Sequence, residues 1–322
     1  AAHTMTVSTD LQHGTKENGD CCNSPAMPPE WLDRAKFNRG RKFFMDHFVS
    51  VLLGMYTSLA SGLCVTNLLV PLVYTKKSDT PTKSFRRYFS TFRQVVLWHL
   101  GDVWDSPHGV AHESILNVRH MHKHVAASMD HHEPGKLHVS QYDMTLVQCG
   151  FMGAIVMYPK QFGISCRESD LEDYIHFWRG IGYLLGIDDK YNLCQGSYDE
   201  TYSICKEIET ETIIPALDNP PSDFKKMVKA FIEGSNIPVK FKLFSFEAIF
   251  AWIYEIMGLS LPAVKLGFVD GIRYRLYKGV VRILRSFPSV ERFCCRKGTY
   301  KIYFLDIESS GEKARYMTCP LA

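Results

Sequence analysis

Apolar positions recur along much of this chain at the spacing of one side of an α-helix. The repeat is clearest over residues 110–129, where it advances in steps of four, three, four, three and four residues. An α-helix places such positions on a single face. The members of the stripe are Ala111, Ile115, Val118, His122, Val125 and Met129. Because five of the six are apolar, the pattern predicts an inward-facing helix that carries one histidine into the interior.

An inward-facing histidine needs a partner. A polar group left without a hydrogen bond in a protein core costs roughly 1–3 kcal/mol. His120 and His124 lie about 200° further round the predicted helix and therefore face elsewhere. Two interpretations of His122 remain open from the periodicity: a core histidine bound to a backbone carbonyl, or a ligand of a metal or of haem iron.

Helical periodicity extends to both sides of this segment. Residues 84–103 carry two adjacent stripes, and the second places Arg87 and Thr91 one turn apart on the same side. Further helices are predicted at residues 139–158, where Ser140 is the candidate N-cap, and at 171–187, 198–214, 224–233 and 271–287. Strand-like alternation is scarce outside TYKIYFLDI, residues 299–307. The sequence therefore predicts an all-α fold.

Residues 48–74 contain no charged side chain. About 20 apolar residues suffice to span a bilayer, but Gly54 and Gly62 interrupt this run and Pro71 lies near its end. Basic residues flank both ends, so the positive-inside rule gives no orientation. A buried helix or helical hairpin and a membrane-inserted segment both remain open.

Composition and charge narrow the class of protein. Of the 322 residues, 46% are hydrophobic and 22% charged, which provides for a sizeable core. The net charge of +3, with both signs interspersed, argues against a nucleic-acid surface. The ten scattered cysteines and the lack of a secretory pattern favour an intracellular protein with free thiols. We expect a disordered arm over 1–28, one helical domain over 29–298 and a tail over 299–322.

The common metal and phosphate motifs are incomplete. His112-Glu113 lacks the second histidine of H-E-x-x-H, and a di-iron motif is approached only at 173–176, with Asp in place of Glu. Neither a Gly-rich phosphate loop nor a G-x-S-x-G element is present. A single inward histidine between apolar walls is, by contrast, a common way to hold haem with one coordination position open to O₂.

The segment VRHMHKHV, residues 118–125, resembles the V-R-x-M-H-x-x-V/I element of the latex-clearing proteins, or rubber oxygenases. Their wider family includes the endoplasmic-reticulum oxygenase of mycophenolic acid biosynthesis. Arg87 and Thr91 resemble the R-x-x-x-T pair of the family's preceding helix. SQYDMTLVQCGF and EDYIHFWRGIGYLLGI resemble its next two helices. The resemblance covers roughly residues 85–187.

This resemblance implies a globin-like helical core with additional helices around haem b, and O₂-dependent oxidation of an apolar substrate. It implies that His122 is the ligand of the haem iron and that Arg119, in the same element, is a further cofactor contact. Arg87 is expected to pair with a haem propionate or to orient Thr91, and both are candidate catalytic residues. We expect an intracellular protein that is either cytoplasmic or located at the endoplasmic reticulum membrane, and association with a membrane is left open.

The chain departs from the rubber oxygenases at two places. Those enzymes have a lysine just before the threonine, where this chain has Ser90, and a distal glutamate, whereas residues 67–74 contain no acid. Two other classes therefore stay open. One is a membrane-associated lipid-binding protein without catalytic activity, and the other is a haem-based sensor or carrier.

Overall fold

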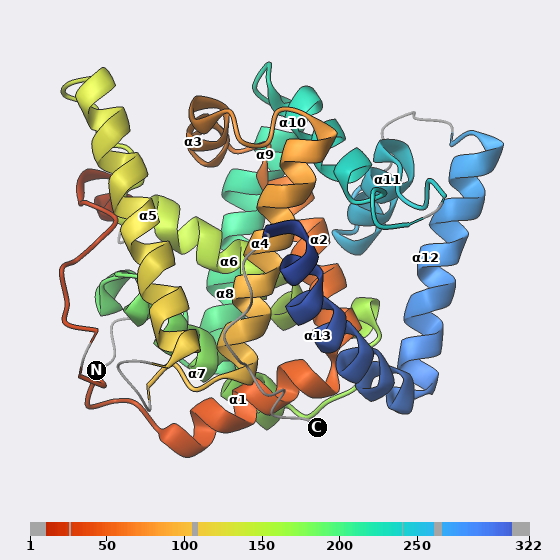
Figure 1. Cartoon of the computed structure of the whole chain (residues 1–322), viewed down its shortest axis with the longest axis horizontal. Coiled ribbons are helices and arrows are strands. Elements are labelled where there is room, and N and C mark those ends of the chain that lie inside the picture. Colours follow the sequence, from red (N-terminus) through yellow and green to blue (C-terminus); the bar gives the residue numbers. More distant parts are fainter. Residues whose placement is uncertain (1–10, 26, 105–108, 240, 261–265, 311–322) are drawn as a thin grey trace.

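The computed structural model describes residues 11–25, 27–104, 109–239, 241–260 and 266–310. Within these residues the chain forms helices and no strand, apart from an isolated bridge between Asn18 and Ser140. The all-α expectation is therefore confirmed. The helices of ten or more residues, drawn in Figure 1, are α1 (Arg34–Asp46), α2 (Phe48–Gly62), α3 (Thr66–Thr75), α4 (Pro81–Leu100), α5 (Val110–His132), α6 (Gln141–Met157), α7 (Glu168–Leu184), α8 (Tyr198–Ile208), α10 (Phe224–Gly234), α11 (Phe246–Ile256), α12 (Phe268–Ser286) and α13 (Pro288–Ser310).

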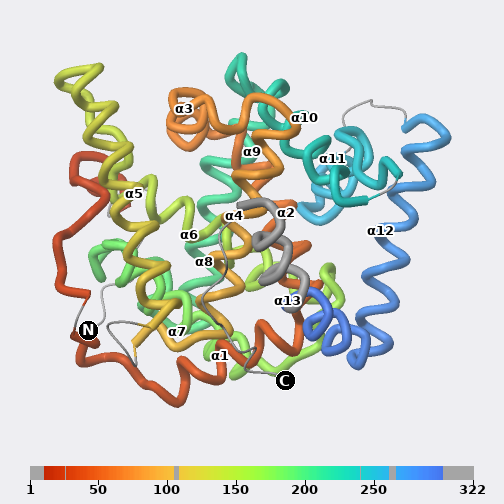
Figure 2. Tube along the Cα trace, in the orientation of Figure 1, coloured from red at the N-terminus to blue at the C-terminus, as the bar shows by residue number. Residues whose placement is uncertain are grey.

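Helix α6 lies at the centre of the helical assembly. It is apolar on nearly every side and packs against α2, α7 and α8, as expected for a helix surrounded by others. Helix α4 contacts α5 on one side and α10 on another. The trace in Figure 2 shows α5 at one edge of the molecule and α12 at the opposite edge. A π-helical turn, η5 (Glu209–Ile213), and the short α9 (Ile214–Asp218) extend α8.

Local capping fixes where the central helices begin. Ser140 caps α6 and forms a capping box with Asp143, which satisfies two backbone N–H groups at the helix start. Thr80 caps α4, whose first residue is Pro81. The predicted N-cap of α6 is thereby confirmed, and α4 begins three residues before the predicted position.

The described part of the N-terminal arm is ordered, which corrects the expectation of disorder for residues 11–25. Leu11 is fully buried, and the Gly19 backbone N–H donates to the Val139 carbonyl at 3.0 Å. A 3₁₀ turn, η2 (Gly14–Lys16), packs against α6. The polar composition of this segment predicted disorder, because composition carries no information about contacts with residues far away in the sequence. Residues 1–10 lie outside the described part.

The β-like expectation for residues 299–307 is wrong, because these residues belong to α13. That helix begins at Pro288, and it packs against α1 and α2. No other strand is available to pair with in the described chain, so helical continuation satisfies the backbone hydrogen bonds instead.

The uncharged run over residues 48–74 forms two helices, α2 and α3. Helix α2 packs against α6 and buries most of its side chains, as the buried-hairpin interpretation expects. Among the described residues, no single helix is both long and apolar enough to cross a membrane. Helices α1 and α2 together meet the length and composition, but the chain bends by 89° between them.

Candidate active site

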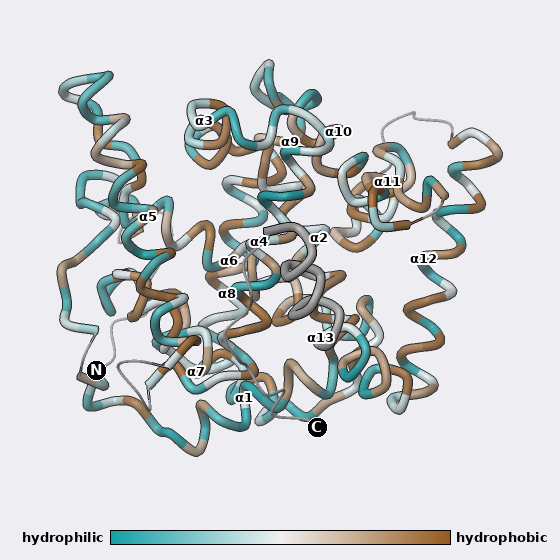
Figure 3. Tube along the Cα trace, viewed as in Figure 1, coloured by the Kyte–Doolittle hydropathy of each residue, from teal (hydrophilic) through white to brown (hydrophobic). Residues whose placement is uncertain are grey.

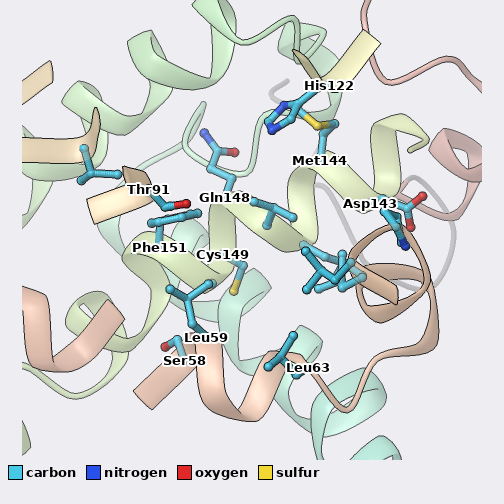
Figure 4. A pocket seen from close by; sticks show the side chains of 18 of the residues that line it. Ser58, Leu59, Leu63, Thr91, His122, Asp143, Met144, Gln148, Cys149 and Phe151 are labelled. Atoms are coloured by element: carbon cyan, nitrogen blue, oxygen red, sulfur yellow. The ribbon is translucent and has the colours of Figure 1, made fainter. Parts of the chain in front are cut away.

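A cavity of about 850 Å³ lies between α4, α5 and α6, and residues of α2, α3, α7, α8 and η5 also contribute to its wall. This volume falls within the roughly 300–1,000 Å³ of typical ligand pockets. Most of its lining is apolar, including Leu59, Leu63, Val118, Val125, Met144 and Phe151. Figure 4 shows side chains converging on this space from several helices. A large space with apolar walls is suited to an apolar ligand or cofactor.

His122 borders the cavity from α5. Its Nδ1 atom is enclosed by protein and has no hydrogen-bond partner, which leaves Nε2 as the nitrogen available to a ligand. Burial and, secondarily, the charge of Arg87 lower the pKa of His122 to about 4. The ring is therefore neutral at pH 7, which is the state an imidazole needs in order to bind a metal.

The periodicity of α5 explains how the imidazole reaches this position. Ala111, Ile115 and Met129 of the predicted stripe are buried in the core. Val118 and Val125 flank His122 along the cavity wall. By contrast, His120 and His124 are solvent-exposed, as their positions on the helix predict.

Arg87 and Thr91 reach the same cavity from α4. The Nη1 atom of Arg87 donates to Thr75 Oγ1 at 2.9 Å, and the Thr91 hydroxyl donates to the Arg87 carbonyl at 3.1 Å. Burial lowers the pKa of Arg87 from its ordinary value. The structure thus brings His122, Arg87 and Thr91 together at one cavity.

Arg119 does not line the cavity, contrary to its expected contact with the cofactor. Its guanidinium forms a buried ion pair with Asp20, with Nη2–Oδ1 at 2.5 Å and Nε–Oδ2 at 2.9 Å. It also donates to the Asn23 and Leu184 carbonyls. These four bonds give Arg119 a structural role in holding the N-terminal segment. The position of Arg119 in the segment 118–125 did not indicate this structural role.

Two further polar residues of the cavity were not among the candidate site residues predicted from the sequence. Gln148 on α6 donates from Nε2 to the Trp178 carbonyl at 2.9 Å and to Asn192 Oδ1 at 3.0 Å, while its Oε1 has no partner. Gly182 provides the necessary space, because a Cβ there would lie 2.5 Å from Gln148 Nε2. Asp143 both completes the capping box of α6 and lines the cavity. The signal in the sequence that could have identified Gln148 is a polar amide among the apolar residues of its predicted helix.

The donor set suits a cofactor that brings its own metal ligands. The described residues contain no group of three or more His, Cys, Asp or Glu side chains that could share a metal ion. A single neutral imidazole beside an apolar space matches instead the one axial ligand that a protein supplies to haem iron. Arg87 provides a cation near the imidazole for an acidic group of such a cofactor.

The described part of the chain is all-helical, and one imidazole, that of His122, borders its largely apolar cavity. Residues 44–219 match the family model described as ER-bound oxygenase mpaB/B'/Rubber oxygenase, catalytic domain. The match covers more than half of the chain and includes Arg87, Thr91, Arg119 and His122. The chain therefore belongs to this family of oxygenases.

Two known proteins are similar to the chain. The rubber oxygenase of Streptomyces sp. (strain K30) is 27% identical over an alignment of 180 residues, and the match covers 51% of this chain and 41% of that protein. The match thus spans less than half the length of this relative. A structure of latex clearing protein LCP in the closed state is 20% identical, with 92% of this chain and 73% of that chain covered and a TM-score of 0.45.

Proposed function

We propose that this protein is a haem b-dependent oxygenase that uses O₂ to oxidise or cleave an apolar, unsaturated lipid or terpenoid. One observation carries the proposal: the neutral imidazole of His122 faces a largely apolar cavity and has no partner for Nδ1. Membership of the oxygenase family supports the class of reaction. The globin-like arrangement of helices around a haem is part of the same proposal.

Bound haem would supply the iron that activates O₂. His122 would hold the iron through Nε2, because its pKa of about 4 keeps the nitrogen lone pair free at neutral pH. Arg87, tethered to Thr75, would pair with a haem propionate. The Thr91 hydroxyl, one turn further along α4, would orient the oxidised part of the substrate by a hydrogen bond. The apolar walls would exclude water from the reacting groups.

The cavity lining includes positions at which this chain differs from the rubber oxygenases. Ser90, at the position of their lysine, lines the cavity, as does Asn67 from the segment without acids. The cavity's acids, Asp143 and Glu209, already accept hydrogen bonds from Ser140 and Tyr158 respectively. We therefore propose an oxidation whose proton-transfer groups differ from those of rubber cleavage.

The Soret absorbance of the purified protein tests the proposal. We expect a Soret band in wild-type protein, its loss in His122→Ala, and its retention in His120→Ala, since His120 is exposed on the same helix. Colourless wild-type protein after expression with added haem would refute haem binding and favour a lipid-binding protein. A haem protein that forms a stable O₂ complex but consumes no O₂ with polyenes would instead be a sensor or carrier.

We also propose that the enzyme is intracellular and works at an anionic membrane surface, which α12 would contact. Large apolar side chains on one side of this helix are exposed, and Phe268 reaches 84%. The others are Val269, Ile272, Leu276, Ile283 and Phe287. Figure 3 shows hydrophobic and hydrophilic positions alternating along α12 at the edge of the molecule. Arg275, Arg282 and Arg285 are exposed beside the apolar stripe, which favours a headgroup layer with negative charge.

Sedimentation with lipid vesicles tests this surface. We expect the protein to co-sediment with vesicles of phosphatidylcholine and phosphatidylserine and to bind far less to phosphatidylcholine alone. Ile272→Glu/Leu276→Glu should abolish binding, whereas Val110→Glu, at an exposed residue of α5 that does not line the cavity, should leave it unchanged. Equal binding of wild type and the α12 variant would refute the assignment.

A further inference from the structure

The cavity has a charged entrance that the proposed reaction does not use. Lys76, Lys77, Lys83 and Arg86 all line the cavity, and all four are solvent-exposed. We call these four residues the cationic rim. Arg87, which also lines the cavity, is largely buried by comparison. The cavity therefore passes from a cationic entrance to an apolar interior.

The cationic rim occupies one short stretch, the turn between α3 and α4 and the first two turns of α4. Lys83 Nζ donates to the Lys76 carbonyl at 3.2 Å and to Asp79 Oδ1 at 2.8 Å. The bond from Arg87 to Thr75 ties α4 to the end of α3 a second time. These bonds hold the rim cations at the same end of the cavity.

Most of the rim's charge is uncompensated. Asp79 forms an ion pair with Lys83, and this pairing lowers the pKa of Asp79. Within the described part of the chain, no acidic side chain forms an ion pair with Lys76, Lys77 or Arg86. Four cations and one acid thus leave three positive charges at the entrance.

The acids of the cavity wall offset only part of this charge. Asp143 accepts hydrogen bonds from the backbone and hydroxyl of Ser140. Glu209 is buried and is paired with Lys206. Ser140 does not neutralise Asp143, whose Oδ1 has no partner, but this one carboxylate offsets at most one of the three rim charges. A bound anion is therefore the complement that the rim lacks.

We propose that the substrate is an amphiphile, with a carboxylate or phosphate at one end held by the cationic rim and an unsaturated apolar chain extending into the cavity. This inference rests on the proposed function, because the same cavity binds the substrate. The rim would contribute to affinity through charge-assisted hydrogen bonds to the anionic end group. It would also fix which end of the chain remains at the entrance, and therefore which bond comes near His122.

Binding of three probes with the same chain tests the proposal. Farnesoic acid, farnesyl phosphate and farnesol share the farnesyl chain, and farnesol is uncharged. Isothermal titration calorimetry on the full-length haem protein should give dissociation constants for both anions about tenfold or more below that of farnesol at low salt. This advantage should shrink in about 0.5 M NaCl, because salt screens exposed charges. The two anions report separately whether carboxylate or phosphate is preferred.

A charge-neutralised variant locates the effect. Lys76→Gln/Lys77→Gln/Arg86→Gln should weaken binding of both anions by about tenfold and change farnesol binding by less than twofold. The matched control is Lys225→Gln/Lys229→Gln/Arg292→Gln, which removes two lysines and one arginine that are exposed but do not line the cavity. This control should bind all three probes as wild type does. All six positions are solvent-exposed, so we expect both variants to fold.

Several results would overturn the cationic rim as a headgroup site. They are equal affinity of wild type for the three probes, an equal loss in the control variant, and a loss of haem from the rim variant that shows the cations serve the haem propionates. The proposed function fails separately. A protein without a Soret band that still prefers the anionic probes would refute haem chemistry and support the rim.

Discussion

Replacing Asp20 by asparagine tests whether the buried ion pair with Arg119 holds the N-terminal segment in place. Both side chains are nearly inaccessible, at 5% and 6% exposure. Burial opposes the charge on Asp20, but the hydrogen bonds from Arg119 and the Cys22 backbone outweigh it and hold the pKa at about 2, against an ordinary 3.8. The difference between the two pKa values, at about 1.36 kcal/mol for each pH unit, corresponds to about 2.5 kcal/mol of stability.

The sign of the pH dependence follows from the lowered pKa. A carboxyl whose pKa is lower in the folded protein stabilises the fold at pH values above its unfolded pKa. This contribution is lost as the pH falls through the folded value. Asp20→Asn should therefore lower the free energy of unfolding by about 2–3 kcal/mol at pH 7, and the deficit should shrink to about half by pH 3.

Urea unfolding at pH 7, 5, 4 and 3, followed by circular dichroism, measures this difference. Lys123→Gln is the control, because Lys123 lies 3.3 Å from Asp20 but is half-exposed, and its loss should cost less than about 1 kcal/mol. Equal stability of wild type and Asp20→Asn at pH 7 would refute the role assigned to the pair. A deficit that stays constant down to pH 3 would show that it does not arise from the charge of Asp20.

Three further predictions concern packing, catalysis and thiol reactivity. Gly40→Ala should destabilise the fold by about 1–3 kcal/mol, since its Cβ would lie 2.3 Å from the Asp173 carbonyl oxygen. Gly271→Ala, which has open space around the new Cβ, should stabilise α12 by about 0.5–1 kcal/mol. Thermal unfolding measures both changes, and equal shifts in the two variants would contradict the packing argument. Thr91→Val should keep its Soret band and lose about tenfold in kcat, the equivalent of one hydrogen bond; unchanged turnover would exclude Thr91 from the reaction. Iodoacetamide should modify the exposed Cys22 well before Cys205, because the hydrogen bond with Cys149 and burial both raise the pKa of Cys205. Mass spectrometry of the modified peptides measures the order, and earlier modification of Cys205 would contradict the prediction.

The sequence was most informative where a local pattern determines structure. The helical periodicity of α5 and the Ser140 cap of α6 depend on residues a few positions apart, and both predictions are confirmed. The contacts of residues 11–25 with the rest of the chain include the ion pair of Asp20 with Arg119, 99 positions away. No local pattern encodes such a pair, and polar composition therefore predicted disorder. For the same reason, the sequence led us to expect a cofactor contact for Arg119 and not its ion pair with Asp20.

Periodicity also indicates the direction of a side chain without indicating what lies there. The stripe of α5 is continuous, but its ends are packed in the core while Val118, His122 and Val125 in the middle face a cavity. A core and an apolar cavity select the same residue types, so the pattern cannot separate them. The difference is made by α4 and α6, which approach α5 without filling the space beside His122. An imidazole is a candidate ligand only because of that unfilled space, and this explains why the two interpretations of His122 could not be resolved from its own helix.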